Sequence, residues 1–328
     1  MIKKTMDLPP TTLEILNKLQ NHSESYVVGG CLRDHFFNKE PNDLDFVTTL
    51  SVSTLEKLFP NFQTSEAGRK FGVGRLRYKG QQIEITSRTL NNNWLFHYLE
   101  HKDFTINSLI HDGKNLIGTQ SAFDHINSKK LHYQEHPSIH LQENPQSLIR
   151  AIRLSSELPI SWSDELHEIY KQSHEHWNQI SSHRLNQEGL KLLHSTYLDK
   201  AFIYLNSLGF IPNKLVNWTK PDEKLKPYIL LCILSTNTSK DAVSQFISLF
   251  HLSKWKDSYE NLYNTISPII PAILNNQPIP VDCLQGLSFK YNAVLIQDIL
   301  SFVRHYHNNS PIFQEFRTNF IEITKKNA

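Results

Sequence analysis

The chain has 328 residues, 39% of them hydrophobic and 20% charged, a balance typical of a folded protein with more than one core. No apolar run approaches the ~20 residues of a membrane span, and the first residues lack the apolar stretch of a signal peptide, so we expect a cytoplasmic protein without membrane contact. Three separated cysteines, Cys31, Cys232 and Cys283, predict neither a zinc site nor disulfides. The net charge of +2 argues against a protein that coats DNA but allows a local basic patch.

Helix start signals mark two segments near the beginning of the chain. The capping box Thr11-Thr12-Leu13-Glu14 predicts that a helix opens after Pro9-Pro10. A second box, Ser53-Thr54-Leu55-Glu56, predicts another helix that ends before Pro60.

Strand signals alternate with these helices over the first hundred or so residues. Short hydrophobic runs predict strands at residues 25–28 and 42–48, with a helix over residues 31–37 between them. Residues 71–78 and 82–86 predict a hairpin, since the intervening Lys79-Gly80 suits a tight turn. The first part of the chain is therefore expected to be of mixed α/β class.

Everything after about residue 140 has the spacing of amphipathic helices. Residues 145–158 carry Leu148, Ile149, Ile152 and Leu158 on one helical face. Further segments repeat the pattern without a fixed period, at residues 201–208, 225–234, 242–252 and 293–305.

Two carboxylates that share a strand face carry the main chemical signal. Strand alternation places Asp43 and Asp45 on one side, and Leu44 and Phe46 on the other, toward the core. Adjacent carboxylates repel each other, which favours a cation between them, and Mg²⁺ binds one or two carboxylates together with phosphates and water. Glu84, on a later predicted strand, is the candidate third carboxylate of a site for displacement at phosphorus.

A glycine pair lies just upstream, where a predicted strand meets a predicted helix. Gly29-Gly30 would let the backbone approach a phosphate, and the helix N-terminus adds N–H donors. Arg33 follows within the first turn and could reach the same phosphate. Alone, a Gly-Gly is usually a turn and an Asp-x-Asp a solvated strand end, but their order within one strand–turn–helix–strand unit is far more specific.

These residues resemble a known family. Tyr26-Val27-Val28-Gly29-Gly30-Cys31-Leu32-Arg33-Asp34, followed by Asn42-Asp43-Leu44-Asp45, is similar to the first motif of the class II tRNA nucleotidyltransferases and bacterial poly(A) polymerases. His101-Lys102-Asp103-Phe104-Thr105-Ile106-Asn107 resembles that family's Arg-Arg-Asp-Phe-Thr-Ile-Asn motif. Residues 71–73, with 83–85 and Arg88, resemble the strands that bring the family's third carboxylate. The resemblance continues at residues 148–153 and 184–188, and it is only faint at residues 282–305.

The resemblance implies a role for each matching residue. Asp43 and Asp45 would bind Mg²⁺ and act in catalysis, with Glu84 assisting. Gly29, Gly30 and Arg33 would bind the triphosphate. The sugar and phosphates would be contacted from the later motif by Lys102, Asp103 and Asn107.

The segment that selects the base departs from the family. Its pattern is Glu-Asp-x-x-Arg, whose Asp and Arg recognise CTP and ATP, and the aligned residues here are Glu143-Asn144-Pro145-Gln146-Ser147. Glu143 and Asn144 remain candidate nucleotide contacts, followed by Arg150 and Arg153 on the next predicted helix. For Asn144 we favour a structural role, as the N-cap of a helix with Pro145 at its first position.

Two further departures concern the connections. Only twelve residues separate Arg88 from His101, whereas CCA-adding members have a longer flexible loop there, so the resemblance favours CC addition. The family's Asp-x-x-Gly-Gly hinge is replaced by Gly118-Thr119-Gln120-Ser121-Ala122, and a histidine, His101, replaces the first arginine of its motif.

The sequence therefore predicts an α/β nucleotidyltransferase head, with a small mixed sheet, followed by an all-α neck and body. We place the head at residues 1–115, the neck at 116–195 and an RNA-binding body at 196–328. Within the neck, Arg184 could pair with Glu188 along one helix. The predicted function is metal-dependent, template-independent transfer of C residues from CTP, with ATP as a second candidate substrate, to a tRNA 3′ end. Alternatives are a poly(A) polymerase, a transferase for another RNA, and a catalytically weak RNA-binding relative; no protein partner is inferred.

Overall fold

The computed structural model describes residues 1–41, 43–89, 93–134, 137–212, 218, 220, 225–275, 277, 279, 293–307 and 311–326. Their contacts divide the chain into two compact units. The first comprises Met1–Ser147 with Pro159–Ile169, and the second Leu148–Leu158 with Tyr170–Ala328. The three-part division after residues 115 and 195 stays a prediction.

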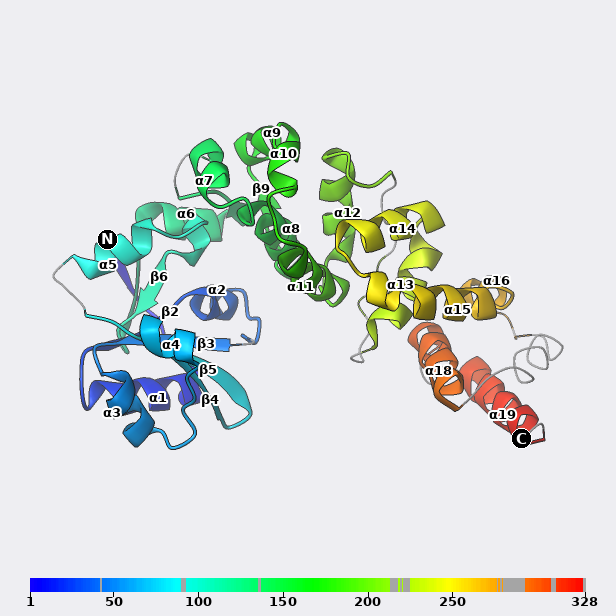
Figure 1. The fold of residues 1–328 in the computed structure, drawn as a ribbon, viewed down its shortest axis with the longest axis horizontal. Helices are drawn as coiled ribbons and strands as arrows, with labels where there is room; N and C mark the ends of the chain where they lie inside the picture. The colour runs from blue at the N-terminus through cyan, green and yellow to red at the C-terminus, as the bar shows by residue number, and fades with distance from the viewer. Residues whose placement is uncertain are drawn as a thin grey trace. The chain divides into compact units, whose positions relative to one another are not determined.

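A mixed sheet forms the centre of the first unit (Figure 1). Its order is β1-β7-β6-β2-β3-β5-β4, and every neighbouring pair is antiparallel except β3 with β5. Helices α1 and α2 both pack against the central strands β2 and β3. The strands are β1 (Ile2–Thr5), β2 (Ser25–Val28), β3 (Asp43–Thr48), β4 (Val73–Tyr78), β5 (Gln81–Ser87), β6 (Leu109–His111) and β7 (Asn115–Gly118).

Short helices and one small strand pair complete this unit. β8 (Lys130–Leu131) and β9 (Ser161–Trp162) pair in parallel, so the segment after residue 140 is not entirely helical as the sequence had suggested. The helices are α1 (Pro10–Gln20), α2 (Gly30–Phe36), α3 (Val52–Leu58), α4 (Glu66–Phe71), α5 (Trp94–Glu100), the 3₁₀ turn η1 (Thr105–Asn107), α6 (Gln120–Asn127), α7 (Pro137–Glu143) and α9 (Asp164–Lys171).

The strands that position the candidate site lie where the sequence predicted them. β2 has the predicted bounds, and β3 is Asp43–Thr48. Asn42, the first residue of the predicted strand, lies outside the described residues. The predicted hairpin is β4 and β5, but its first strand begins at Val73 and not at Phe71, which is the last residue of α4. Its two turn residues, Lys79 and Gly80, both have positive φ, at 49° and 85°. Positive φ at both central residues is the geometry that matches the twist of paired strands.

Both predicted helix caps are wrong in detail. α1 begins at Pro10 without a side-chain cap, and the Glu14 carboxylate accepts hydrogen bonds from Tyr78 and Lys79 instead. α3 is capped two residues earlier than predicted, by Ser51, whose hydroxyl accepts from the Thr54 N–H. In α1, the glutamate of the predicted box is thus engaged by the β4–β5 hairpin and does not cap the helix.

The second unit is built of helices around an aromatic core. Phe250 packs directly on Gly189, where a Cβ would lie 2.5 Å from the Phe250 Cβ, so only glycine fits that point of α11. Its elements are α8 (Ser147–Glu157), α10 (His174–Trp177), α11 (Ser182–Leu193), α12 (Leu198–Ser207), α13 (Pro227–Asn237), α14 (Lys240–Leu249), η2 (Ser253–Trp255), α15 (Lys256–Ile266), α16 (Ile270–Leu274), α18 (Ala293–His307) and α19 (Pro311–Lys326).

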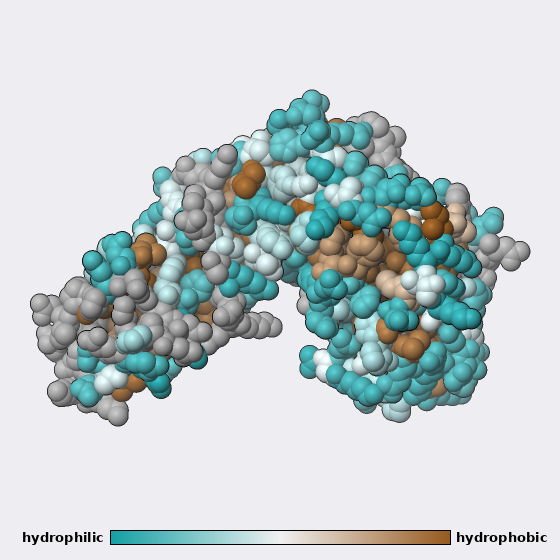
Figure 2. Space-filling view, turned by 180° about the vertical axis from the view of Figure 1, so that it is seen from behind, coloured by the Kyte–Doolittle hydropathy of each residue, from teal (hydrophilic) through white to brown (hydrophobic). Residues whose placement is uncertain are grey.

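The expected fold class, a mixed α/β head followed by a largely helical remainder, is confirmed. No helix in the described part of the chain has the length and apolar character needed to span a membrane. Figure 2 shows hydrophilic residues over much of the visible surface, with hydrophobic residues in scattered groups. Cys31 and Cys232 are buried free thiols, and Cys283 lies outside the described residues, as does the part of the faintly similar tail that precedes Ala293.

Candidate active site

The turn between β2 and α2 is shaped around a carboxylate of the neighbouring strand. Val28 pairs with Asp45 across β2 and β3, and Gly29 follows with a φ of +83°. A Cβ at Gly29 would lie 2.9 Å from the Asp45 Oδ2. Both the backbone conformation and the missing side chain are therefore needed for Asp45 to lie against the turn.

The carboxylate of Asp45 is close enough to those of Asp43 and Glu84 to be repelled by both. Strand alternation is as predicted: Leu44 and Phe46 are buried, while Asp43 is exposed and Asp45 half-buried. Glu84 is the register partner of Asp45 on the parallel strand β5. Burial, and then repulsion from Glu84 and Asp43, raise the pKa of Asp45 to about 6. A cation placed here would relieve that repulsion.

Glu84 is already engaged with a positive group. The Arg75 Nε donates to its Oε2 at 2.8 Å, across the β4–β5 hairpin. Arg75 was not identified from the sequence, although the two-residue turn at Lys79-Gly80 sets the register that pairs it with Glu84. The assisting role of Glu84 toward a metal stays a prediction.

The donor set fits a magnesium ion through Asp43 and Asp45. Mg²⁺ needs only one or two protein carboxylates when substrate phosphates and water fill its other positions. Among the described residues, no three His, Cys, Asp or Glu side chains come close enough together to form a complete metal cage. A site of this kind would therefore depend on the nucleotide to complete the coordination.

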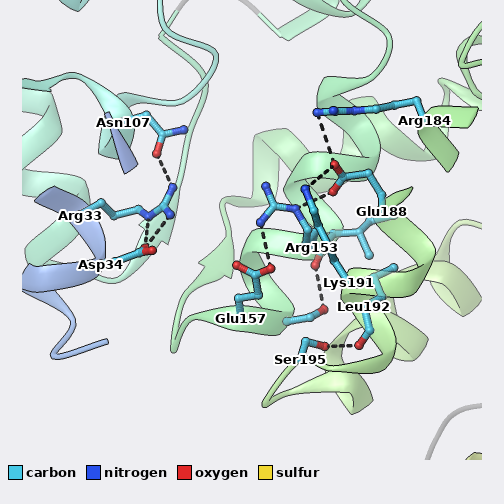
Figure 3. Close-up of polar contacts among 12 residues, drawn as sticks. Arg33, Asp34, Asn107, Arg153, Glu157, Arg184, Glu188, Lys191, Leu192 and Ser195 are labelled. Carbon is cyan, nitrogen blue, oxygen red and sulfur yellow. Dashed lines mark hydrogen bonds and ion pairs between the residues drawn. The ribbon is translucent and has the colours of Figure 1, made fainter. Parts of the chain in front are cut away.

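Arg33 is held by a buried set of hydrogen bonds (Figure 3). Its Nε and one Nη donate to the Asp34 Oδ1 at 2.8 and 2.6 Å, and the other Nη donates to the Asn107 Oδ1 at 2.6 Å. Asn107 donates in turn to the Asp103 Oδ1 at 2.9 Å. Three of the six candidate nucleotide-binding residues of the head motifs are thus joined directly, although Arg33 and Asn107 are 74 residues apart in the sequence.

The guanidinium of Arg33 also lies over the glycine pair. A Cβ at Gly30 would be 3.1 Å from one of its Nη atoms. A guanidinium has five N–H groups, and the bonds to Asp34 and Asn107 use three of them. The positive group therefore lies beside the turn whose backbone is predicted to approach the triphosphate, and its contact with phosphate stays a prediction.

Lys102 brings a second positive charge toward the carboxylates. Its Nζ lies 3.6 Å from the centre of the Tyr98 ring, a cation–π contact that positions the ammonium group. The charge of Lys102 lowers the pKa of Asp45, against the larger effects of burial and the other carboxylates. Tyr98 was not identified from the sequence, because nothing in its own segment indicated which side chain it would contact.

The predicted cap at Asn144 is wrong. α7 ends at Glu143, Pro145 and Gln146 form a turn, and α8 begins only at Ser147, whose N–H donates to the Asn144 carbonyl at 3.0 Å. Pro145 therefore does not occupy the first helical position. The candidate roles of Glu143 and Asn144 toward a nucleotide stay predictions.

Arg150 and Arg153 belong to the second unit. Arg153 donates to the Glu157 Oε1 at 2.9 Å and to the Glu188 Oε2 at 2.5 Å, and these opposite charges hold its pKa above the ordinary value (Figure 3). The predicted pair of Arg184 with Glu188 is present at 3.3 Å. In this structure Arg153 joins α8 to α11, which gives it a structural role beside its predicted contact with nucleotide.

Comparisons with known proteins agree with the motifs. Residues 25–131 match the poly(A) polymerase head domain family. A CC-adding tRNA nucleotidyltransferase of Halalkalibacterium halodurans is 28% identical over 61% of this chain, and the match spans 52% of that relative's length. A CCA-adding enzyme of Lactobacillus johnsonii is 24% identical over 84% of this chain and 82% of its own.

The fold of this chain also resembles that of a solved CCA-adding enzyme. The crystal structure of the Bacillus stearothermophilus CCA-adding enzyme in complex with CTP has a TM-score of 0.71, at 19% identity, and covers 96% of this chain and 83% of that one. At this identity the likeness concerns the fold. Residues 25–131 thus match the poly(A) polymerase head domain, and the long alignments with curated relatives and the shared fold make most of this chain similar to CCA-adding enzymes.

Proposed function

We propose that this protein transfers nucleoside monophosphates from NTPs to the 3′ end of a tRNA in the cytoplasm, with magnesium as the metal and C as the preferred nucleotide. The observation that carries the proposal is the position of Asp45, whose carboxylate lies against Gly29 and opposite Glu84. This places a desolvated negative charge beside a turn that suits phosphate. Such a site favours a metal-bound nucleotide over either component alone.

Each group of the site has a distinct task in this reaction. Asp43 and Asp45 would hold magnesium, which when bound neutralises charge on the α-phosphate and favours deprotonation of the RNA hydroxyl. Gly29 and Gly30 leave the backbone open to the triphosphate, and Arg33 supplies hydrogen bonds to it. The 3′-oxygen then forms a bond to the α-phosphorus while the bond to the bridging oxygen breaks, and pyrophosphate leaves.

Preference for C rests on the connection between β5 and the Lys102 motif. Twelve residues separate Arg88 from His101, and α5 occupies seven of them, Trp94–Glu100. A connection largely taken up by a helix has little length for a flexible loop. The curated relative with 28% identity is named for CC addition, which supports the same preference.

The test is incorporation of each labelled NTP alone into tRNA that lacks its 3′ end, with and without Mg²⁺. The proposal expects magnesium-dependent incorporation from CTP that exceeds incorporation from ATP, GTP or UTP. Long products from ATP would indicate a poly(A) polymerase, and activity only on another RNA would change the substrate class. Absence of incorporation from every NTP, with tRNA binding retained, would establish the RNA-binding alternative.

A further inference from the structure

A short segment after α6 pairs with the motif predicted to contact the nucleotide's sugar. Phe104 and Tyr133 form an antiparallel bridge. The Thr105 N–H donates to the His132 carbonyl at 3.1 Å, and the Gln134 N–H donates to the Asp103 carbonyl at 3.1 Å. The backbone around Asp103 is therefore fixed by residues that match none of the family motifs.

Tyr133 extends this connection to the start of α8. Its ring stacks on Phe104, with centroids 5.0 Å apart and planes 16° apart, and it also contacts His140 on α7. Its hydroxyl hydrogen-bonds to the Ser147 hydroxyl at 2.7 Å. Tyr133 is 7% exposed and Ser147 is fully buried, so water does not compete strongly for this bond.

Ser147 occupies the position at which the family has its base-selecting arginine. Here that side chain is small, fully buried and bonded to Tyr133. An arginine at position 147 would need space that Tyr133 fills. The hydroxyl of Ser147 therefore fixes the turn after Glu143 and Asn144, and base contact from position 147 is lost.

We propose that Tyr133 is a positioning residue for nucleotide selection, an inference that rests on the proposed function. It ties the Asp103–Asn107 segment, on the sugar side, to Ser147 at the end of the base-side turn, and both lie in the first unit. In this chain a buried hydroxyl pair and an aromatic stack hold the base-side turn in place, where the family uses a charged contact with the base. Loss of the pair should loosen selection more than it slows the chemical step.

The test compares Tyr133→Phe, Ser147→Ala and the double variant. In each, KM and kcat are measured for CTP and UTP with tRNA lacking its 3′ end, together with Tm. Removal of one buried hydrogen bond should lower the ratio of kcat/KM for CTP over UTP by about two- to tenfold, mainly through KM. The double variant should lose no more than the larger single effect, because both changes remove the same bond.

Tyr259→Phe is the matched control. It removes another buried Tyr–Ser bond, from Tyr259 to Ser235 at 2.8 Å, in the second unit. It should lower Tm comparably and leave the CTP to UTP ratio unchanged. An unchanged ratio in Tyr133→Phe, or an equal fall in Tyr259→Phe, would overturn the inference while leaving the proposed function standing. A wild-type protein that incorporates no NTP would overturn both.

Discussion

The Asp45 carboxylate is repelled by two other acidic groups, Glu84 and Asp43, and lies against a glycine whose missing side chain makes room for it. Strand alternation and the order of the motifs were enough to bring Gly29, Asp43 and Asp45 together from the sequence. Arg75 and Tyr133 were found only in the structure. Their importance depends on which side chains they contact across strands, and single-residue patterns do not contain that information.

Asp45→Asn should abolish incorporation and leave the fold intact. The neutral amide removes the repulsion with Glu84 and Asp43, so Tm should be unchanged or higher, while the metal loses a charged ligand. Incorporation from labelled CTP and thermal unfolding measure the two effects. Asp7→Asn, an exposed acid of the same unit, is the control and should alter neither. Normal turnover in folded Asp45→Asn would refute the metal assignment.

Two stacked histidines predict how the stability of the first unit depends on pH. The rings of His125 and His132 lie 3.8 Å apart, and His125 Nδ1 is 2.8 Å from the Thr105 hydroxyl. Burial lowers the pKa of both rings below 6.5, and the charge of His132 lowers that of His125 further. Asp124 and Glu165 oppose the shifts.

The folded protein therefore favours neutral rings. The stability linked to them is present above pH 6.5 and is lost as the pH falls through the lowered values. His132→Phe keeps an aromatic ring for stacking and removes one titrating group. Thermal unfolding at pH 7.5 and 5.5 should show a smaller drop in Tm for this variant than for the wild type, and equal drops would show that other groups govern the acid response.

At the scale of elements, local sequence patterns predicted the helices, strands and turns that are formed by segments close together in the chain. The unit from β2 to β3 and the β4–β5 hairpin follow from hydrophobic runs and a two-residue turn. β1 was missed, because it has a mostly exposed side-chain pattern and pairs with β7 more than a hundred residues later. Such a pairing is set by the completed sheet, and its own four residues carry little signal.

Helices α8 and α11 are joined by a buried ion pair whose loss should be costly. Glu188 is fully buried and accepts from Arg153, which is itself 14% exposed. Glu188→Ala would leave the buried Arg153 charge with Glu157 as its partner, so the cost should be below the about 3–5 kcal/mol of a wholly uncompensated buried charge and still above that of an exposed pair. Urea unfolding measures it, with Arg69→Ala as the control, since the exposed pair of Arg69 with Glu56 should contribute only about 0–1 kcal/mol. Equal effects of the two substitutions would contradict this prediction.

At the scale of the whole molecule, composition and periodicity predicted a mixed first part and a helical second part. They could not predict that the contacts of α8 place it with Tyr170–Ala328, while Pro159–Ile169 returns to the first unit. An amphipathic helix shows that one face is buried, but the partner of that face is known only once the chain has folded. The candidate nucleotide residues are consequently divided between units, with Arg150 and Arg153 in the second.

The choice of nucleotide depends on residues from several parts of the chain. It is the sharpest test of whether this chain acts like the CC-adding or the CCA-adding relatives. With CTP and ATP supplied together, tRNA lacking its 3′ end should gain C residues and then stop, because the Arg88–His101 connection is short. Discrimination should also be loose. The arginine of the family's base-selecting pair is replaced by a buried serine, and a bidentate base contact is typically worth ~1–3 kcal/mol, or roughly tenfold to over a hundredfold.

Product lengths on sequencing gels test the stop after C addition separately from the loose discrimination between bases. The Lactobacillus johnsonii CCA-adding enzyme is the reference protein. The expected pattern is a product that ends in C, with UTP misincorporated more often than by the reference. Efficient synthesis of complete CCA would contradict the argument from the short connection and leave the argument from Ser147 untouched. Strict selection of CTP would show that another side chain contacts the base. The residues around Asn144 would then be the first to mutate in a search for that side chain.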